Sequence, residues 1–346
     1  MVRFLLALSL SAAALAEGSP AVLHRYEAVE PHMGTLVRIT VYTPDEKTAQ
    51  AAFHAAFDRI RSLDAVLSDY RPASELNQIT KSAINRPVQV SEDLLAVLRA
   101  SQNLAEATEG AFDITQGPVI RLWREARKTG QLPDPAALRE AAERGGFRKL
   151  HLDAGNQTVT LDTPGMILDL GAIGKGYAAS EAIEVLTGLG VRSALVAVSG
   201  DLAFSDAPPH ERGWRIDLRP GGLPIDGVPD VLQLTHAAVS TAGSSEQHVD
   251  IDGHRYSHII NPASGTALVN DVTVTVVAPH GLEADGLDTA VSVLGADRGL
   301  ALIESTPGAA ALVVSRSPAG TTVRHSTRFA ALAAEQKGLQ ALGFGL

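Results

Sequence analysis

The alternation of apolar and polar positions predicts a strand and then a long helix near the start of the chain. Residues 35–42, TLVRITVY, alternate with a period of two, which is typical of a strand with one buried face. Residues 47–67 carry apolar side chains every three or four positions, which favours a helix. That apolar stripe consists of Phe53, Ala56, Phe57, Ile60, Leu63 and Leu67. The following LSDYRPASELNQI, residues 67–79, is expected to be a loop.

A second helix is predicted between a capping residue and a stop. Ser91 is a good N-cap before two acidic residues, and Gly110 is a good C-terminal stop. Its apolar stripe is Leu94, Leu95, Leu98 and Leu104. Residues 131–142 contain two prolines, which indicates a surface excursion with a short helix after it.

The second half of the chain begins with a predicted β-turn-α-β unit. It consists of an apolar strand MILDL (166–170), a glycine-rich turn GAIGKG (171–176), a helix (177–190) and a strand (193–201). Further on, residues 249–260 read as two short strands joined by Asp252-Gly253, a strong hairpin signal because both residues tolerate positive φ. Strand alternation would then place Tyr256, His258 and Ile260 on one face.

Composition bounds the architecture and the location of the protein. The 346 residues are 45% hydrophobic, without an internal repeat, which favours one large domain or two subdomains that share a cleft. Residues 1–16 have a basic residue, an apolar run and a small-x-small end, which predict a signal peptide and an exported, periplasmic protein. We expect an N-terminal extension at 17–30, the main domain at 31–330 and a tail at 331–346.

Charge and cysteine content exclude several kinds of site. The formal net charge of −10 argues against a nucleic-acid partner, which would need clustered Lys and Arg. The chain has no cysteine, so a disulfide, a thiolate metal site, a cysteine nucleophile and a lipid-modified cysteine are all excluded. A bound metal would therefore have oxygen or histidine ligands.

Three segments carry candidate chemistry, each with a structural alternative. The glycine-rich turn sits between Asp169 and Lys175, where backbone N–H groups can approach a phosphate, but it is equally compatible with a tight turn of left-handed residues. The sequence position of Asp113, taken alone, favours a turn-capping role over ligand binding. His258 lies at a strand end before an Asn-Pro turn, although strand histidines more often have a structural role.

A fourth segment, EADGLDTAVSVLG at 283–295, has two interpretations. Asp285, Asp288 and Thr289 would share one face of a helix within reach of one ion. Alternatively, Asp285 caps the helix and Asp288 is a first-turn acid. The cation would be one that prefers oxygen ligands, such as Mg²⁺, which is usually coordinated by phosphate oxygens as well as by the protein.

Together these segments resemble the ApbE family, the FAD:protein FMN transferases. The resemblance runs from about residue 31 to 305 and rests on five motifs in the family's order. They are HMGT (32–35), LSDYRPASELNQI (67–79), GAFDITQGP (110–118), LDLGAIGKGYAAS (168–180), and SHIINPASG (257–265) with ADGLDTA (284–290).

The resemblance implies an α+β fold with mixed or antiparallel sheets, packed helices, two intertwined subdomains and a central FAD cleft. It implies Mg²⁺-dependent cleavage of FAD, transfer of FMN to a threonine hydroxyl of an exported or membrane-associated redox protein, and release of AMP. The implied metal ligands are Asp285, Asp288, Thr289 and the carbonyl of Ala172, and the implied general base is His258, with Asp288 as second candidate. The implied FAD contacts are Met33, Tyr70, Ala111, Phe112, Asp113, Asp169, Lys175 and Ile259.

Two departures from the family pattern and three rival functions remain at this point. Ser199-Gly200-Asp201 stands where the family usually has Gly-Gly-Asp, and Ser244 stands where it commonly has an acid. The rivals are an FAD pyrophosphatase, a non-catalytic FAD-binding protein, and a Rossmann-type oxidoreductase. The order of glycines in residues 171–176 counts against the last of these.

Overall fold

The computed structural model describes residues 22–219, 224–243 and 248–341. The expected signal peptide lies outside these residues. No helix within them is long and apolar enough to cross a membrane. The boundaries expected at residues 31 and 331 both fall inside elements, because strand β1 spans His24–His32 and helix α8 spans Thr327–Ala341.

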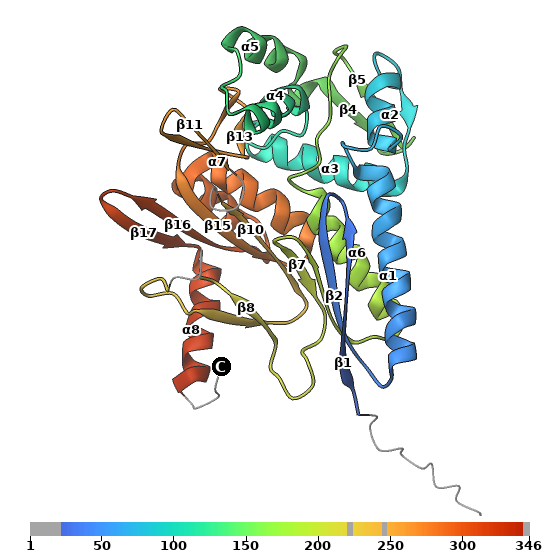
Figure 1. The fold of residues 1–346 in the computed structure, drawn as a ribbon, viewed down its shortest axis with the longest axis vertical. Coiled ribbons are helices and arrows are strands. Elements are labelled where there is room, and N and C mark those ends of the chain that lie inside the picture. Colours follow the sequence, from blue (N-terminus) through green and yellow to red (C-terminus); the bar gives the residue numbers. More distant parts are fainter. Residues whose placement is uncertain (1–21, 220–223, 244–247, 342–346) are drawn as a thin grey trace, which may run out of the picture.

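An antiparallel sheet of eight strands forms the centre of the molecule (Figure 1). Each neighbouring pair is antiparallel, which confirms the α+β class. The strand predicted at residues 35–42 lies second in the sheet. The order across the sheet is β1, β2 (Thr35–Thr43), β6 (Ser193–Val198), β7 (Asp201–Phe204), β10 (Ala237–Gly243), β15 (Asp271–Ala278), β16 (Ala310–Ser317) and β17 (Gly320–His325).

Three long helices cover one face of this sheet: α1 (Glu46–Leu67), α6 (Gly174–Gly188) and α7 (Gly281–Ser305). The predicted stripe of α1 packs there, with Phe57 and Ile60 buried against residues of β2, β6 and α6. Asp45 caps α1 by accepting from the Thr48 backbone N–H at 2.7 Å. This apolar layer is the main core of the protein.

The other face of the sheet is covered by α8 and by the pair of strands β8 (Trp214–Asp217) and β9 (Val231–Leu234). Phe204, Trp214 and Phe329 form the centre of this second layer. The sheet is therefore enclosed on both sides, and ligands must reach it from an end.

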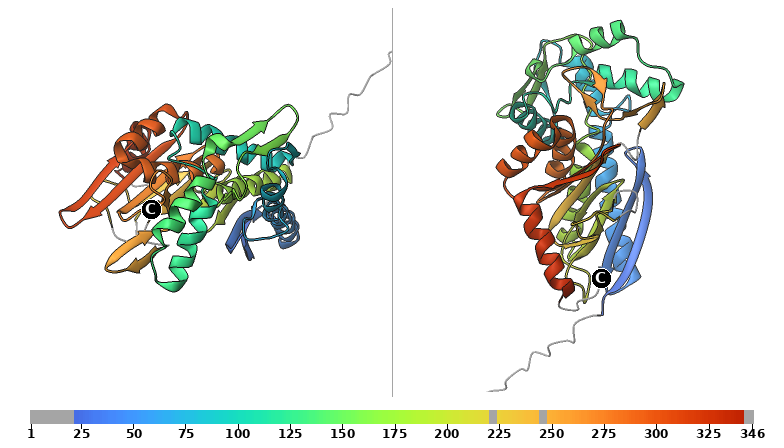
Figure 2. Two further views of the ribbon diagram at one scale, coloured as in Figure 1. Left: turned by 90° about the horizontal axis from the view of Figure 1, so that it is seen from above. Right: turned by 90° about the vertical axis from the view of Figure 1, so that its left-hand side faces the viewer.

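The remaining elements gather at one end of the molecule, opposite α8 (Figures 1 and 2). The helix predicted between Ser91 and Gly110 is α3, and the Ser91 side chain caps it by accepting from Leu94 N–H. The short helix expected after residues 131–142 lies instead mostly within them, because α5 begins at Pro135. This end contains α2 (Glu75–Ser82), β3 (Val88–Gln89), α3 (Glu92–Ala107), α4 (Gly117–Thr129), α5 (Pro135–Arg144), η1 (Phe147–Lys149), β4 (Leu150–Asp153), β5 (Thr158–Leu161), β11 (His248–Ile251), β12 (His254–Ser257), β13 (Ile260–Asn261) and β14 (Thr266–Ala267).

Other element predictions are wrong. The strand expected at 193–201 is β6, which ends at Val198, and Asp201 begins the next strand, β7. Residues 166–170 do not form a strand, because their only ladder contact is a single bridge from Ile167 to Gln116, although the segment is buried as its apolar pattern indicates. The expected loop at residues 67–79 ends in helix α2. The signal there is Ser74, whose side chain accepts from Asn77 N–H as an N-cap.

The glycine-rich turn differs from its expected conformation. None of Gly171, Gly174 and Gly176 has a left-handed φ, so the tight-turn interpretation is wrong. Glycine is required at 176 because α6 and α7 cross backbone to backbone there. A Cβ on Gly176 would lie 2.0 Å from the carbonyl oxygen of Gly281, and a Cβ on Gly281 would lie 2.1 Å from that of Gly176.

The start of α7 also differs from the capping interpretation. The helix begins at Gly281 after His280, four residues before Asp285, and its first-turn acid is Glu283. Asp285 and Asp288 therefore lie inside the helix, and the capping interpretation is wrong. The hairpin is confirmed, because Asp252 and Gly253 have φ of 52° and 78° between β11 and β12.

Candidate functional site

A cavity of about 790 Å³ is lined both by residues of the main sheet and by residues of the end that holds α4. Every residue assigned above to catalysis, FAD binding or metal binding lines it. They arrive from the β1–β2 turn, the segments around α1, α4 and α6, the β12–β13 connection and α7. The fold thus brings the five separated motifs to one cavity.

Three of the four metal-site candidates lie on α7, where Asp285 faces the start of α6. Asp285 and Asp288 are almost fully buried one helical turn apart, and Thr289 lies beside them. The Gly176 backbone N–H donates to Asp285 Oδ2 at 2.9 Å, and Lys175 Nζ lies 3.6 Å from Asp285 Oδ1. The close crossing of α6 and α7 is what allows this backbone donor to reach the carboxylate.

A third carboxylate, Asp201 at the start of β7, completes this acidic cluster. Lys175 Nζ donates to Asp201 Oδ2 at 2.7 Å. The hydroxyl of Ser240 contacts Asp201 Oδ1 and also lies 2.6 Å from Asp288 Oδ2. A serine hydroxyl has one hydrogen, so one of these two contacts needs a proton from a carboxyl group.

Burial of negative charge dominates the electrostatics of this cluster. Burial, with the charge of Asp201 adding to it, raises the pKa of Asp285 to about 7, against the opposing effect of Lys175. Burial and the neighbouring Asp285 raise the pKa of Asp288 well above its ordinary value. The nearby carboxylates raise the pKa of Lys175 in spite of its own burial. Three carboxyl groups therefore share one ammonium group, and the site favours additional positive charge.

An arginine from α4 organises the opposite side of the cavity. Arg124 binds Asp169 Oδ2 at 2.7 Å and also contacts the carboxylate of Asp69. Its guanidinium carbon lies 4.5 Å from the ring centroid of Tyr70, whose side chain is otherwise largely exposed. Burial and the charge of Asp69 raise the pKa of Asp169, which Arg124 opposes. Tyr70 thus presents an aromatic surface at the mouth of the cavity.

The segment before α4 is held by Asp113. Asp113 Oδ1 accepts from the backbone N–H of Thr115 at 2.8 Å, and Oδ2 accepts from Gln116 Nε2 at 2.9 Å and from Phe147 N–H at 3.2 Å. Phe112 is buried in the core beneath this turn. Asp113 therefore has the turn-capping contacts that its sequence position indicated, and it presents Ala111 to the cavity.

The other predicted residues lie on connections that frame the cavity. Met33 has a φ of 50° in the β1–β2 turn and packs against both apolar core clusters to which α1 contributes residues. Asp169 accepts from Gly171 N–H at 2.9 Å, just before Ala172. His258 and Ile259 lie between β12 and β13, so the expected strand alternation does not continue to His258.

Sequence reasoning missed several residues of the site. Neither Asp201 nor Ser240 was predicted to be a site residue. Ser240 contacts both Asp201 and Asp288, which are far from it in the chain, and no local pattern encodes these contacts. Arg124 and Arg127 also line the cavity from α4, a helix that was not predicted. Their spacing of three along the chain would have placed them on one face of a helix there.

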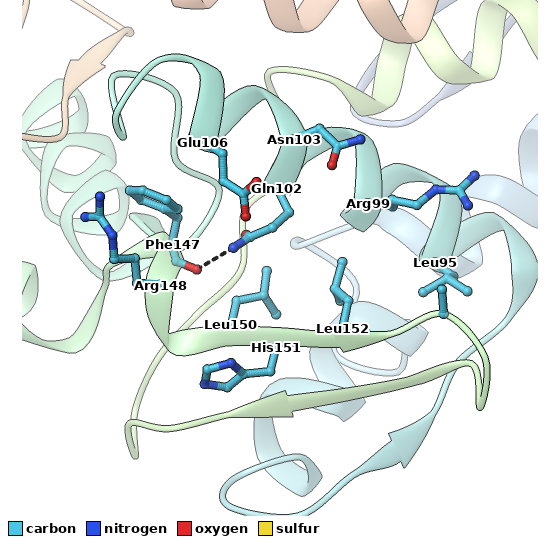
Figure 3. A pocket seen from close by; sticks show the side chains of 11 residues that line it. Leu95, Arg99, Gln102, Asn103, Glu106, Phe147, Arg148, Leu150, His151 and Leu152 are labelled. Carbon is cyan, nitrogen blue, oxygen red and sulfur yellow. Dashed lines mark hydrogen bonds between the residues drawn. The ribbon is translucent and has the colours of Figure 1, made fainter.

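A second cavity, of about 700 Å³, lies away from these residues between α3 and β4 (Figure 3). Arg99, Gln102 and His151 line it together with leucines from both elements. Gln102 Nε2 donates to the Phe147 carbonyl at 2.9 Å, which ties α3 to the turn before β4. None of the predicted site residues lines this cavity.

Comparison with known sequences gives consistent matches over most of the chain. A sequence model of the ApbE family matches residues 33–313. An FAD:protein FMN transferase of Treponema pallidum is 35% identical over 315 residues, covering 86% of each chain. An FAD:protein FMN transferase of Salmonella typhimurium is 32% identical over 271 residues, covering 77% of each.

Solved structures agree with the sequence matches. The flavin transferase ApbE from Vibrio cholerae superposes with a TM-score of 0.79 at 27% identity, covering 89% of this chain and 99% of that one. The flavinyl transferase ApbE of Pseudomonas stutzeri, in its apo form, gives a TM-score of 0.78 at 27% identity, covering 90% and 97%. The arrangement of sheet and helices is therefore shared with these proteins.

Proposed function

The chain belongs to the ApbE family and transfers FMN from FAD to a protein, and on this premise we propose that the reaction uses Mg²⁺ and a threonine hydroxyl as acceptor. The supporting observation is the acidic cluster of Asp201, Asp285 and Asp288, which lines the same cavity as the aromatic and glycine-rich segments. Asp285 and Asp288 of this cluster would supply two of the oxygen ligands that a divalent cation prefers beside a diphosphate.

The residues present fit a hard cation. Within the described residues no group of three or more His, Asp or Glu is placed to hold a metal by itself. The proposed set has two carboxylates, the Thr289 hydroxyl and the Ala172 carbonyl, which leaves positions for phosphate oxygens and water. When bound there, Mg²⁺ would polarise the diphosphate and neutralise charge on the departing AMP.

The flavin half of the substrate would occupy the side of the cavity formed by Met33, Tyr70 and residues 111–113. Tyr70 and Met33 offer an aromatic and a polarizable surface for a flat ring. Lys175 lines the same cavity and would offer its ammonium group to the phosphates. Asp169 and Ile259, which also line the cavity, complete the proposed contacts.

We assign the general base to His258. Its imidazole would take the proton of the threonine hydroxyl while that oxygen attacks the phosphorus of the FMN half. The new bond is threonine oxygen to phosphorus, and the bond that breaks joins this phosphorus to the bridging oxygen, which leaves with AMP. Asp288 remains the second candidate, although its burial and its contact with Ser240 favour a role in binding the cation.

The test is transfer to a candidate acceptor from the same organism in the presence of FAD and Mg²⁺. We expect in-gel flavin fluorescence of the acceptor, an added mass equal to FMN on a threonine, and one AMP for each FMN transferred. Asp285→Ala should abolish transfer while circular dichroism stays unchanged. His258→Ala should slow transfer strongly with FAD binding retained.

Three outcomes would contradict parts of this proposal. Free FMN and AMP without an adduct would indicate hydrolysis. An adduct on another residue type would exclude the threonine. Full activity of Asp285→Ala in EDTA would exclude the cation.

We also propose that the protein acts outside the cytoplasm on an exported or membrane-associated redox protein. The support is the leader-like pattern of residues 1–16, with its small-x-small end. Cell fractionation of the full-length chain with a C-terminal tag tests this. Recovery of the unprocessed chain in the cytoplasm would contradict it.

A further inference from the structure

Lys175 lies within the acidic cluster that the proposed function assigns partly to a cation. Its ammonium group bridges two carboxylates, at 2.7 Å from Asp201 Oδ2 and 3.6 Å from Asp285 Oδ1. The lysine side chain is 29% exposed, compared with 6% for Asp201 and 4% for Asp285. The ammonium group therefore covers these carboxylates from the side of the cavity.

The free oxygen of each carboxylate is identified by its other partner. Asp285 Oδ2 accepts from Gly176 N–H at 2.9 Å, which leaves Oδ1 facing Lys175. Asp201 Oδ1 contacts the Ser240 hydroxyl, which leaves Oδ2 to Lys175. The outer oxygen of Asp285, which a cation from the cavity would bind, is thus the one that faces the ammonium group.

A divalent cation and an ammonium group at the same carboxylate oxygen would repel each other. The backbone of Lys175 is fixed, because the next residue is locked in the crossing of α6 and α7. The flexible four-carbon stem of the lysine is free of this restriction. Binding of a cation therefore requires a movement of the lysine side chain alone.

We propose that Lys175 is the exchangeable counter-ion of this cluster, neutralising Asp201 and Asp285 in the metal-free protein and moving to a phosphate of FAD when Mg²⁺ binds. The inference rests on the proposed Mg²⁺ dependence and adds that Mg²⁺ binds before Lys175 contacts the phosphate. Binding of the metal both fills the site and releases the Lys175 ammonium group, which then binds the phosphate. Lys175 is then a positioning residue with two alternative partners.

The test compares binding of Mg²⁺ and binding of FAD in Lys175→Met, which keeps the length of the side chain and removes its charge. Calorimetry without FAD should show about tenfold tighter Mg²⁺ binding than in the wild type, because the competitor is gone. Quenching of FAD fluorescence at saturating Mg²⁺ should show about tenfold weaker FAD binding. A purely structural role of Lys175 would weaken both.

Arg127→Met is the matched control, since Arg127 lines the same cavity from α4 and is not part of the acidic cluster. Its Mg²⁺ affinity should stay within twofold of the wild type. Arg127→Met loses the same positive charge as Lys175→Met. If its Mg²⁺ affinity is unchanged, the tighter Mg²⁺ binding of Lys175→Met is caused by loss of the direct lysine contact and not by loss of long-range repulsion. A comparable gain in Arg127→Met would overturn the proposal.

A crystal structure with Mg²⁺ and without FAD provides the direct readout. We expect Lys175 Nζ to be beyond hydrogen-bond distance of Asp285 Oδ1 and Asp201 Oδ2. The inference alone falls if Mg²⁺ binds while the lysine keeps both partners, or if Lys175→Met binds Mg²⁺ no tighter. If the wild type binds no Mg²⁺, both the inference and the proposed cation fall, whereas flavin transfer is judged separately by the acceptor assay.

Discussion

Asp285 connects the electrostatics of the site to the stability of the protein. Its pKa is raised from 3.8 to about 7 by burial and by Asp201, so the folded state holds a proton that the unfolded state has already lost between these pH values. The stability of the metal-free protein should therefore fall as pH rises from about 4 to 7, because the folded state binds more protons there.

Urea unfolding in EDTA at pH 5 and pH 7 measures this effect. We expect a loss of a few kcal/mol in the wild type between these values, at about 1.4 kcal/mol for each unit of pKa difference. Asp285→Asn, which cannot ionise, should lose markedly less over the same range. Identical pH profiles of the two proteins would assign the dependence to other groups.

At the scale of elements, the crossing of α6 and α7 determines whether the cluster can form. Gly176→Ala would place a methyl group 2.0 Å from the Gly281 oxygen and 2.8 Å from Asp285 Cβ. Since backbone occupies that space, the helices must separate and the bond from Gly176 N–H to Asp285 is lost. We expect a loss of roughly 3 kcal/mol or more in unfolding free energy, as for severe overpacking, together with loss of transfer activity.

Gly188→Ala is the control on the same helix. An added Cβ at Gly188 meets no atom within 4 Å. Alanine is the better helix former by up to about 1 kcal/mol, so this variant should be neutral or slightly more stable. The close crossing would be unimportant if both alanine variants unfolded at the same urea concentration.

The same elements show what local sequence can and cannot predict. The strand at 35–42 and the stripe of α1 follow periodicities that each segment carries by itself, and both are confirmed. The start of α7 was missed because His280 makes no side-chain cap bond, and the reason for Gly281 lies more than a hundred residues away at Gly176. Local patterns therefore predicted that this helix exists but did not predict its first residue.

At the scale of the whole molecule, Arg124 joins the end that holds α4 to the segments around Asp69 and Asp169. Both carboxylates are mostly buried, so Arg124→Met would leave two negative groups without their cation. We expect a loss of roughly 3–5 kcal/mol in unfolding free energy, measured with urea, and weaker FAD binding.

Arg61→Met removes an arginine from an ion pair with Asp58 on the exposed side of α1. It should cost less than about 1 kcal/mol, because water screens such pairs. An equally small effect of Arg124→Met would mean that the two parts of the molecule are held together by other contacts.

The residues of the site that lie in sequence motifs were predictable, and those that join it through the sheet were not. The resemblance placed its residues in one cavity because five motifs carry them, whereas Asp201 and Ser240 join the cluster only through the pairing of β7 with β10. Strand pairing of that kind depends on the complete sheet. Contacts made across it, such as Ser240 to Asp288, have no signature in either segment alone.

The contact between Gly176 and Gly281 has a consequence for how the sequence can diverge. A side chain at either position meets the main chain of the other, and no replacement at the partner removes a carbonyl oxygen. No second substitution can therefore make room for a side chain at either glycine. In a pair of packed side chains, by contrast, a smaller residue at one position can accommodate a larger residue at the other. Descendants of this chain that keep the helix crossing should keep both glycines, even where the acidic residues beside them have been lost with the activity.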